Sequence, residues 1–188
     1  MKIERERWLQ AQTQEIHHAI YDLNQLEQSI NYYFNYFGDT HKIHGLKVAE
    51  IGCSTFPMAS FFPDMQITGV DPLFNQFNDQ VKFYWKTHQI TAVSEAFEDW
   101  KTDEQFDEVW FINCLQHVID PDLCLIKAKS LGKRVRVFEP INWPVDNMHP
   151  HTFTIDYFKN FFPDSDIKFY QGGTIPAFHF ADCAYFVS

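Results

Sequence analysis

The feature that most constrains the fold is a series of short apolar runs separated by longer amphipathic stretches. The runs occupy residues 48–51, 67–70, 90–93, 109–112 and 135–138. A strand that is buried on both faces of a parallel sheet reads as such a continuous apolar run. The stretches between the runs, most clearly residues 122–131, are suited to helices. This alternation predicts an α/β fold in which helices cover both faces of a parallel sheet.

The C-terminal part of the chain departs from this alternation. A helix is expected over residues 155–162, and two more strand-like runs follow at 167–170 and 184–187. A turn-rich segment, Gly172-Gly173-Thr174-Ile175-Pro176, joins them. A hairpin of this kind reverses the last strand. We therefore expect a Rossmann-like, seven-stranded, mostly parallel sheet with an antiparallel final strand.

The N-terminal segment has a helical pattern. Between residues 3 and 37, apolar side chains recur at intervals of three, four or seven, and Gly38 ends the pattern. These side chains are Ile16, Ile20, Leu23, Ile30, Phe34 and Phe37. A chain of 188 residues suffices for one compact domain. We predict a single domain, with an N-terminal helical extension over 1–45 and a core over 46–188.

Charge and cysteine usage narrow the classes of partner. The net charge of -10, with no run of Lys or Arg, disfavours a nucleic acid as partner. The sequence has no apolar stretch of about 18 residues and no signal-peptide pattern, which disfavours a membrane. The four cysteines form no C-x-x-C pair, so no structural metal is expected. These features predict a cytoplasmic protein and leave its oligomeric state open.

A first candidate ligand site follows the first apolar run, in Glu50-Ile51-Gly52-Cys53-Ser54-Thr55-Phe56-Pro57. Small residues allow a ligand to approach the backbone, and a helix is expected to begin near Pro57. Asp71 ends the second run, about 20 residues after Gly52, which is the spacing at which an acid binds ribose hydroxyls. An ordinary turn and a helix cap are the structural alternatives for these two segments.

Residues 47–142 resemble the class I S-adenosylmethionine-dependent methyltransferases in the order and spacing of their motifs. The glycine-rich turn, Gly69-Val70-Asp71-Pro72 and the segment Phe106–Val118 carry the resemblance, and the closing hairpin matches the family's reversed final strand. The resemblance implies S-adenosylmethionine as cofactor and methyl transfer to a hydroxyl or amine of a small molecule. It implies that the methionine part lies at Glu50, Gly52, Cys53 and Ser54, the ribose at Asp71 and Pro72, the adenine near Glu95, Ala96 and Phe97, and the sulfonium between Asn113 and Cys114.

The segment after the fifth run supplies candidates for the acceptor end. His149 and His151 are the predicted catalytic bases, because a histidine near neutrality can take a proton from a hydroxyl or amine. Four further side chains are predicted to bind the substrate: His117, Trp143, Asp146 and Met148. The alternatives are that the histidines bond the backbone of a loop, or that they bind a metal together with Asp146.

Other functions fit the sequence less well. The segment Gly52–Phe56 lacks the final glycine of a hydrolase nucleophile elbow, and no Tyr-x-x-x-Lys pair of a dehydrogenase occurs. Ser54 and Phe56 stand where many methyltransferases have glycine. They motivate the main alternative, a catalytically inactive methyltransferase-like domain that binds a ligand or a protein.

Overall fold

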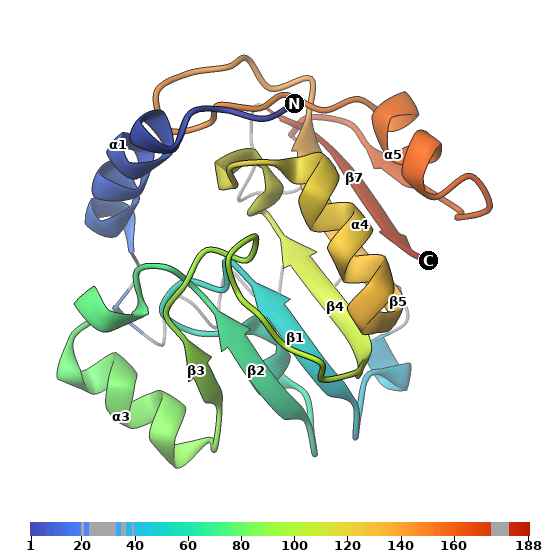
Figure 1. Cartoon of the computed structure of the whole chain (residues 1–188). Helices are drawn as coiled ribbons and strands as arrows, with labels where there is room; N and C mark the ends of the chain where they lie inside the picture. Colours follow the sequence, from blue (N-terminus) through green and yellow to red (C-terminus); the bar gives the residue numbers. More distant parts are fainter. Residues whose placement is uncertain (20, 23–32, 35–36, 39, 174–180) are drawn as a thin grey trace.

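The computed structural model describes residues 1–19, 21–22, 33–34, 37–38, 40–173 and 181–188. Seven strands form one sheet in the order β3-β2-β1-β4-β5-β7-β6 (Figure 1). Their bounds are β1 Lys47–Ile51, β2 Gln66–Val70, β3 Thr91–Val93, β4 Phe106–Ile112, β5 Gly132–Ile141, β6 Lys168–Tyr170 and β7 Asp182–Val187. Strands β1 to β5 pair in parallel, and β7 is antiparallel to both β5 and β6. The predicted sheet is confirmed, including its reversed final strand.

The α-helices are α1 Arg5–Glu15, α3 Asp79–Thr87, α4 Pro121–Leu131 and α5 Ile155–Phe161. Each of the last three begins at a side-chain cap: Asn78 accepts from Val81, Asp120 from Leu123 and Thr154 from Tyr157. These caps satisfy amides that a helix start leaves without partners. The short 3-10 turns are η1 Ile16–His18, η2 Thr40–Lys42, η3 Met58–Phe61, η4 Phe74–Gln76 and η5 Leu115–His117.

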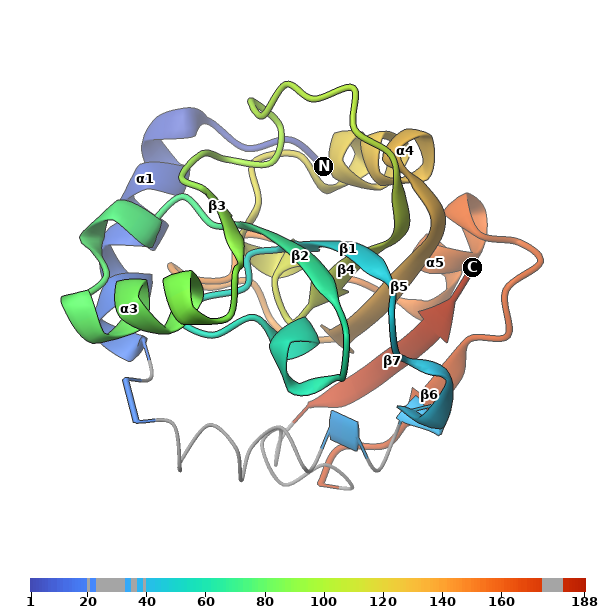
Figure 2. The same cartoon turned by 90° about the horizontal axis from the view of Figure 1, so that it is seen from below.

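Both faces of the sheet are covered. Helices α4 and α5 pack on one face, where Leu125 and Phe158 join a core with the β4 and β5 side chains (Figures 1 and 2). On the other face, Trp85 of α3 packs with Phe62 and Phe37 against Trp110. Because the inner strands lie between these two layers, their side chains are apolar on both sides, as the sequence pattern predicted.

One expected helix differs from the structure: the helix expected near Pro57 is the single 3-10 turn η3. Over the N-terminal pattern, the described residues form α1, η1 and helical backbone at 33–34 and 37. Ile20, Leu23 and Ile30 of that pattern lie outside the described residues. Phe37 is fully buried against Tyr185, with stacked rings 4.7 Å apart. In the described part of the chain, no helix combines the length and apolar character that crossing a membrane requires.

Candidate functional site

A cavity of about 290 Å³ lies at the edge of the sheet where the parallel strands β1, β2 and β4 end. Ligands of open α/β sheets bind at this edge. Most of the predicted cofactor residues line the cavity, namely Glu50, Gly52, Cys53, Ser54, Asp71, Pro72, Ala96, Phe97, Asn113 and Cys114. The predicted substrate residue His117 lines it as well. Their binding roles remain predictions.

The turn after β1 requires glycine for two reasons. Gly52 has a φ of 60°, which favours glycine, and an added Cβ would lie 2.6 Å from the Cβ of Cys114. The backbone of this turn therefore packs directly against Cys114, in the loop that follows β4. Ser54 also has a positive φ, 54°, in the same turn. This close approach brings the two segments of the predicted cofactor site together.

The side chain of Glu50 binds the backbone that follows this turn. Its carboxylate is buried and accepts hydrogen bonds from the amides of Met58 and Ala59, each at 2.7 Å. Burial raises the pKa of Glu50 to about 7, although these two amides favour the charged form. Glu50 thus fixes the start of η3 and places an ionisable group in the cavity wall.

Asp71 stands at the end of β2. Its Oδ1 accepts from the Leu73 amide at 2.8 Å and its Oδ2 from the Ser54 amide at 2.7 Å. Burial raises the pKa of Asp71 to about 6, against the effect of these amides. A carboxylate offers about four acceptor positions, so the side chain can accept two more donors. This capacity matches a pair of ribose hydroxyls.

In the segment predicted to lie near the adenine, the residues that line the cavity differ from the prediction by one position. Ala96 and Phe97 line the cavity, whereas Glu95 does not and Glu98 does. Oε1 of Glu98 accepts from the Ile119 and Asp120 amides, at 2.7 and 2.9 Å. Sequence reasoning missed Glu98 because residues 94–105 form neither helix nor strand, so no periodicity indicates which side chain faces inward.

The loop after β4 is held by a residue that the sequence analysis did not select. Oε1 of Glu139, in β5, accepts from the amides of Cys114 and Leu115, at 2.6 and 2.8 Å. Glu139 is fully buried, and burial raises its pKa to about 7. Asn113 adopts a φ of 55° at the same bend. The signal was present as an acid inside an apolar strand, where a carboxylate needs a specific partner.

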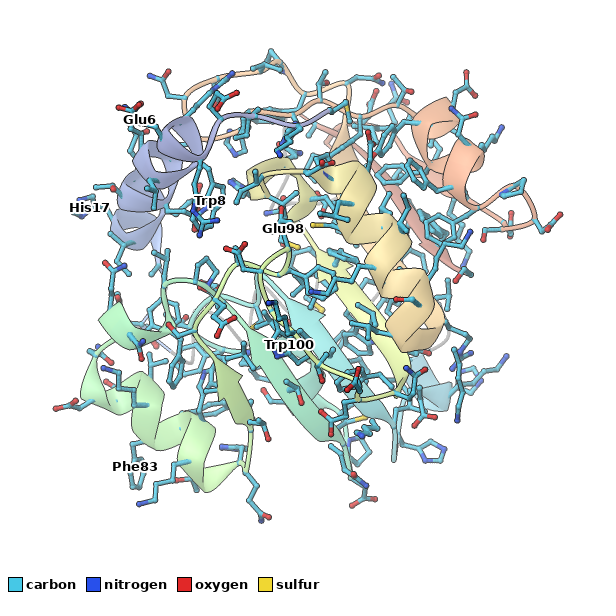
Figure 3. All side chains as sticks on the ribbon, viewed as in Figure 1. Glu6, Trp8, His17, Phe83, Glu98 and Trp100 are labelled. Atoms are coloured by element: carbon cyan, nitrogen blue, oxygen red, sulfur yellow. The ribbon has the colours of Figure 1, made fainter. Side chains whose placement is uncertain are left out.

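The N-terminal helix α1 covers the cavity from the side facing the strand ends. Trp8, Gln12 and Glu15 line it, and Figure 3 shows Trp8 and Glu98 pointing into the same space between α1 and the sheet. Nε1 of Trp8 and Nε2 of Gln12 donate to the carbonyl of His117, at 2.9 and 3.3 Å. Helix α1 therefore packs at the ligand edge of the sheet.

His117 lies between the helix and the loop that carries the other predicted histidines. Its Nδ1 is 3.0 Å from Oε1 of Glu15 and 3.1 Å from the Met148 carbonyl. Burial disfavours the charged ring, but the ion pair with Glu15 and the charge of Glu139 outweigh this effect and raise the pKa of His117. The imidazole is thus oriented by its surroundings and held in an acidic environment.

The predicted catalytic histidines, His149 and His151, do not line the cavity, whereas His117 does. Nδ1 of His149 is 2.9 Å from Oδ1 of Asp146, and the His149 ring is 4.8 Å from the His117 ring. His151 is buried, with Nε2 2.8 Å from the Val118 carbonyl. Their catalytic roles remain predictions.

The remaining predicted substrate residues lie in the same loop. The Trp143 ring is 5.7 Å from that of His149, and Met148 donates its amide to Asp146 at 2.8 Å. Partial burial opposes ionisation of Asp146, but the bonds from His149 and Met148 prevail and lower its pKa to about 2. Across the described residues, no group of three or more His, Cys, Asp or Glu side chains is arranged to hold a metal ion.

Comparison with known proteins identifies the fold. No family model matches the sequence, and no curated protein matches it by sequence. Solved structures do match. The 1,6-didemethyltoxoflavin-N1-methyltransferase of Burkholderia thailandensis, with bound S-adenosylhomocysteine, has a TM-score of 0.64 at 14% identity, covering 97% of this chain and 88% of its own.

Two further structures show the range of chemistry on this fold. The magnesium protoporphyrin IX methyltransferase of Synechocystis PCC 6803, with bound S-adenosylhomocysteine, has a TM-score of 0.61 at 12% identity, covering 85% of this chain and 81% of its own. The cyclase SpnF has a TM-score of 0.60 at 14% identity, covering 79% of each chain. This chain therefore has the fold of the class I S-adenosylmethionine-dependent methyltransferases.

Proposed function

We propose that this protein is an S-adenosylmethionine-dependent methyltransferase that acts on a hydroxyl or amine of a small molecule. The observation that carries the proposal is the meeting of two motifs at one cavity. The Gly52 turn and the Asp71 carboxylate lie together at the strand ends, joined by the bond from the Ser54 amide to Oδ2 of Asp71. Structures with this fold hold S-adenosylhomocysteine, the demethylated form of that cofactor.

The residues present fit this cofactor. Asp71 has acceptor capacity left for ribose hydroxyls, and Ala96, Phe97 and Val118 offer apolar surface for the adenine. Gly52 packs so closely on Cys114 that no side chain fits there, so the turn presents only its backbone at this position. When bound, S-adenosylmethionine supplies an electrophilic methyl group on a positively charged sulfur. The acidic lining, which includes Glu50 and Asp71, favours such a cation.

The contribution of the chain is to orient the acceptor and to exclude water. Helix α1 closes the cavity through the bonds of Trp8 and Gln12 to the His117 carbonyl, so an acceptor would lie between α1 and the strand ends. Holding two reactants in line contributes much of the rate enhancement in such a transfer. His149 and His151 remain candidates for the base, and the contact of the His149 ring with the His117 ring supports a role for His149 that acts through His117.

A cavity covered by a helix suits a small molecule better than a polymer. The net charge of -10 adds to this preference by disfavouring nucleic acid. We propose a small-molecule acceptor, no nucleic-acid partner and a cytoplasmic location.

The second candidate function is a protein of this fold that does not transfer methyl groups, as the likeness to the cyclase SpnF suggests. Calorimetric titration with S-adenosylmethionine and S-adenosylhomocysteine tests the cofactor, and mass spectrometry of candidate acceptors tests the transfer. A methyltransferase binds both compounds and converts one to the other in the presence of an acceptor. Failure to bind either compound would contradict the proposed function.

A further inference from the structure

Carboxylates are the most numerous ionisable side chains that line the cavity. Glu15, Glu50, Asp71 and Glu98 line it, and no lysine or arginine does. All 15 Lys and Arg residues of the chain lie within the described ranges, and all of them lie outside the cavity lining. A cavity lined by one sign of charge attracts ligands of the opposite sign and repels those of the same sign.

Two cations that contact lining residues, Arg5 over the Trp8 ring and Lys127 over the Phe97 ring, have other partners. Nη2 of Arg5 lies 2.7 Å from Oδ2 of Asp99 at the surface. Nζ of Lys127 donates to the carbonyls of Phe97 and Trp100, behind the cavity wall. A phosphate or carboxylate on the acceptor would therefore meet no lysine or arginine in the cavity, which disfavours an anionic acceptor.

The four carboxylates in the lining differ in the groups that they contact. Three of them, Glu50, Asp71 and Glu98, each accept two backbone amides and so shape the turns around the cavity. Glu15 instead extends from α1 to the imidazole of His117, 3.0 Å away. Helix α1 faces the strand ends from the opposite side of the cavity. The pair of Glu15 and His117 therefore lies on the α1 side, where the acceptor is proposed to bind.

We propose that the acceptor is an amine that enters as an ammonium cation and gives its proton to His117, which Glu15 orients. This inference rests on the proposed function and narrows it. The rings of Trp8 and Tyr33 also line the cavity, and aromatic faces attract cations.

The geometry identifies the nitrogen that takes the proton. Nδ1 of His117 faces two acceptors, Glu15 and the Met148 carbonyl, so it keeps its hydrogen and leaves Nε2 as the basic position. The ammonium loses one proton to Nε2, and the nitrogen lone pair then forms the new N–C bond. The S–C bond breaks with its electron pair remaining on sulfur, and the product leaves as a methylated ammonium. Atoms and charge balance with S-adenosylmethionine as the methyl donor.

The ionisable groups that face His117 come from several elements. They are Glu15 of α1, Asp71 after β2, Glu139 of β5 and His149 of the following loop. Three of these four are acids, which favour a proton on the ring and make His117 a stronger proton acceptor. The same acids stabilise an ammonium ion before it transfers that proton.

Calorimetry on the full chain tests the inference without turnover. The protein is first saturated with S-adenosylhomocysteine and then titrated with matched amines, alcohols and carboxylates on benzyl, phenethyl and hexyl skeletons. We expect the amine of at least one skeleton to bind about tenfold more tightly than its alcohol, and the carboxylates to bind most weakly. The variant Glu15→Gln should lose this preference and keep its affinity for S-adenosylhomocysteine.

The matched control is Glu6→Gln, which removes the same charge from the outward face of α1 (Figure 3) and should leave the preference unchanged. If S-adenosylhomocysteine does not bind, the proposed function fails. If it binds and no amine is preferred over its alcohol, or a carboxylate is preferred, the amine inference alone is overturned. An amine preference that survives in Glu15→Gln would also overturn the role of Glu15.

Discussion

Asp71 accepts a hydrogen bond from the backbone amide of Ser54 through Oδ2, at 2.7 Å. This bond joins the end of β2 to the turn after β1, so the two predicted cofactor motifs form one structural unit. Oδ1 of the same carboxylate accepts from Leu73 at 2.8 Å. Asp71 therefore stabilises the backbone around the site and also has acceptor positions left for a ligand.

Replacing Asp71 by Asn should weaken cofactor binding. The amide oxygen of Asn still accepts one backbone donor, but the NH₂ group cannot accept a ribose hydroxyl. Hydrogen bonds to charged groups contribute roughly 1.5–3 kcal/mol, so calorimetric affinity for S-adenosylhomocysteine should fall about tenfold or more. Asp64→Asn, at an exposed turn, is the control with the same change of charge. Unchanged affinity in Asp71→Asn would remove this residue from the binding site.

Gly52→Ala should destabilise the protein more than Gly45→Ala. Both glycines have a positive φ, 60° and 62°, so both variants carry the backbone cost of about 1–2 kcal/mol. At Gly52 the new Cβ would also lie 2.6 Å from the Cβ of Cys114, whereas at Gly45 it meets no atom within 4 Å. Overpacking adds about 1–3 kcal/mol, and urea unfolding of the two variants measures the difference. Equal losses would show that the Cys114 contact yields without cost.

The sheet could be predicted because its inner strands are apolar on both faces. Val48 and Ala49 point to opposite layers, and both are fully buried. The same pattern of apolar runs predicts which residues lie at the strand ends, because parallel strands bring their carboxyl ends to one edge of the sheet. The pattern places Asp71 and Cys114 at this edge, whereas their contacts with the first turn come from the structure alone.

Contacts between distant segments could not be predicted in the same way. Glu139 holds the Cys114 amide across two strands, and Glu15 reaches His117 from a helix at the other end of the chain. Neither pairing leaves a periodic signal in the sequence. The turn η3 replaces the expected helix where Glu50 binds the Met58 and Ala59 amides, a long-range effect that local propensity does not contain.

The free energy of unfolding of the ligand-free protein should fall as the pH rises from about 5 to 8. Burial raises the pKa of Glu50 and Glu139 to about 7 and that of Asp71 to about 6, above the values of 4.5 and 3.8 for the exposed side chains. The folded state therefore binds more protons than the unfolded state in this window, and the stability present below it is lost as the pH rises through the folded pKa. The loss for Glu50 is on the order of 3 kcal/mol.

Urea unfolding at pH 5 and pH 8 measures this slope, and Glu50→Gln should reduce it. The depressed pKa of Asp146, about 2, acts in the opposite direction only at lower pH. The raised pKa of His117 acts in the same direction as the buried acids. A stability that stays level or rises from pH 5 to pH 8 would contradict the prediction.

Single alanine variants of His149 and His151 distinguish a base from a positioning residue. A general base contributes about 10²–10⁴-fold, so a loss of this size in one variant, with cofactor affinity kept, would support the role predicted from the sequence. His149 lies against His117 and outside the cavity lining, so we expect its replacement to slow turnover about tenfold by loosening His117. His151 is buried and contacts the Val118 carbonyl, so its replacement should mainly lower the free energy of unfolding. Near-normal turnover and stability in both variants would rule out both roles.

Helix α1 should control how fast the cofactor product leaves. The Trp8 indole donates to the His117 carbonyl at 2.9 Å, and Trp8→Phe removes this bond while keeping an aromatic ring in the cavity wall. A neutral hydrogen bond contributes about 0.5–1.5 kcal/mol, so dissociation of S-adenosylhomocysteine, followed by stopped-flow fluorescence, should become roughly threefold to tenfold faster. Leu9→Ala is the matched control, because Leu9 lies on the same helix with 52% of its surface exposed. Removal of residues 1–18 should accelerate dissociation further, since it deletes both Trp8 and Gln12, which bond to the His117 carbonyl. Dissociation at the wild-type rate after this truncation would show that α1 does not act as a lid.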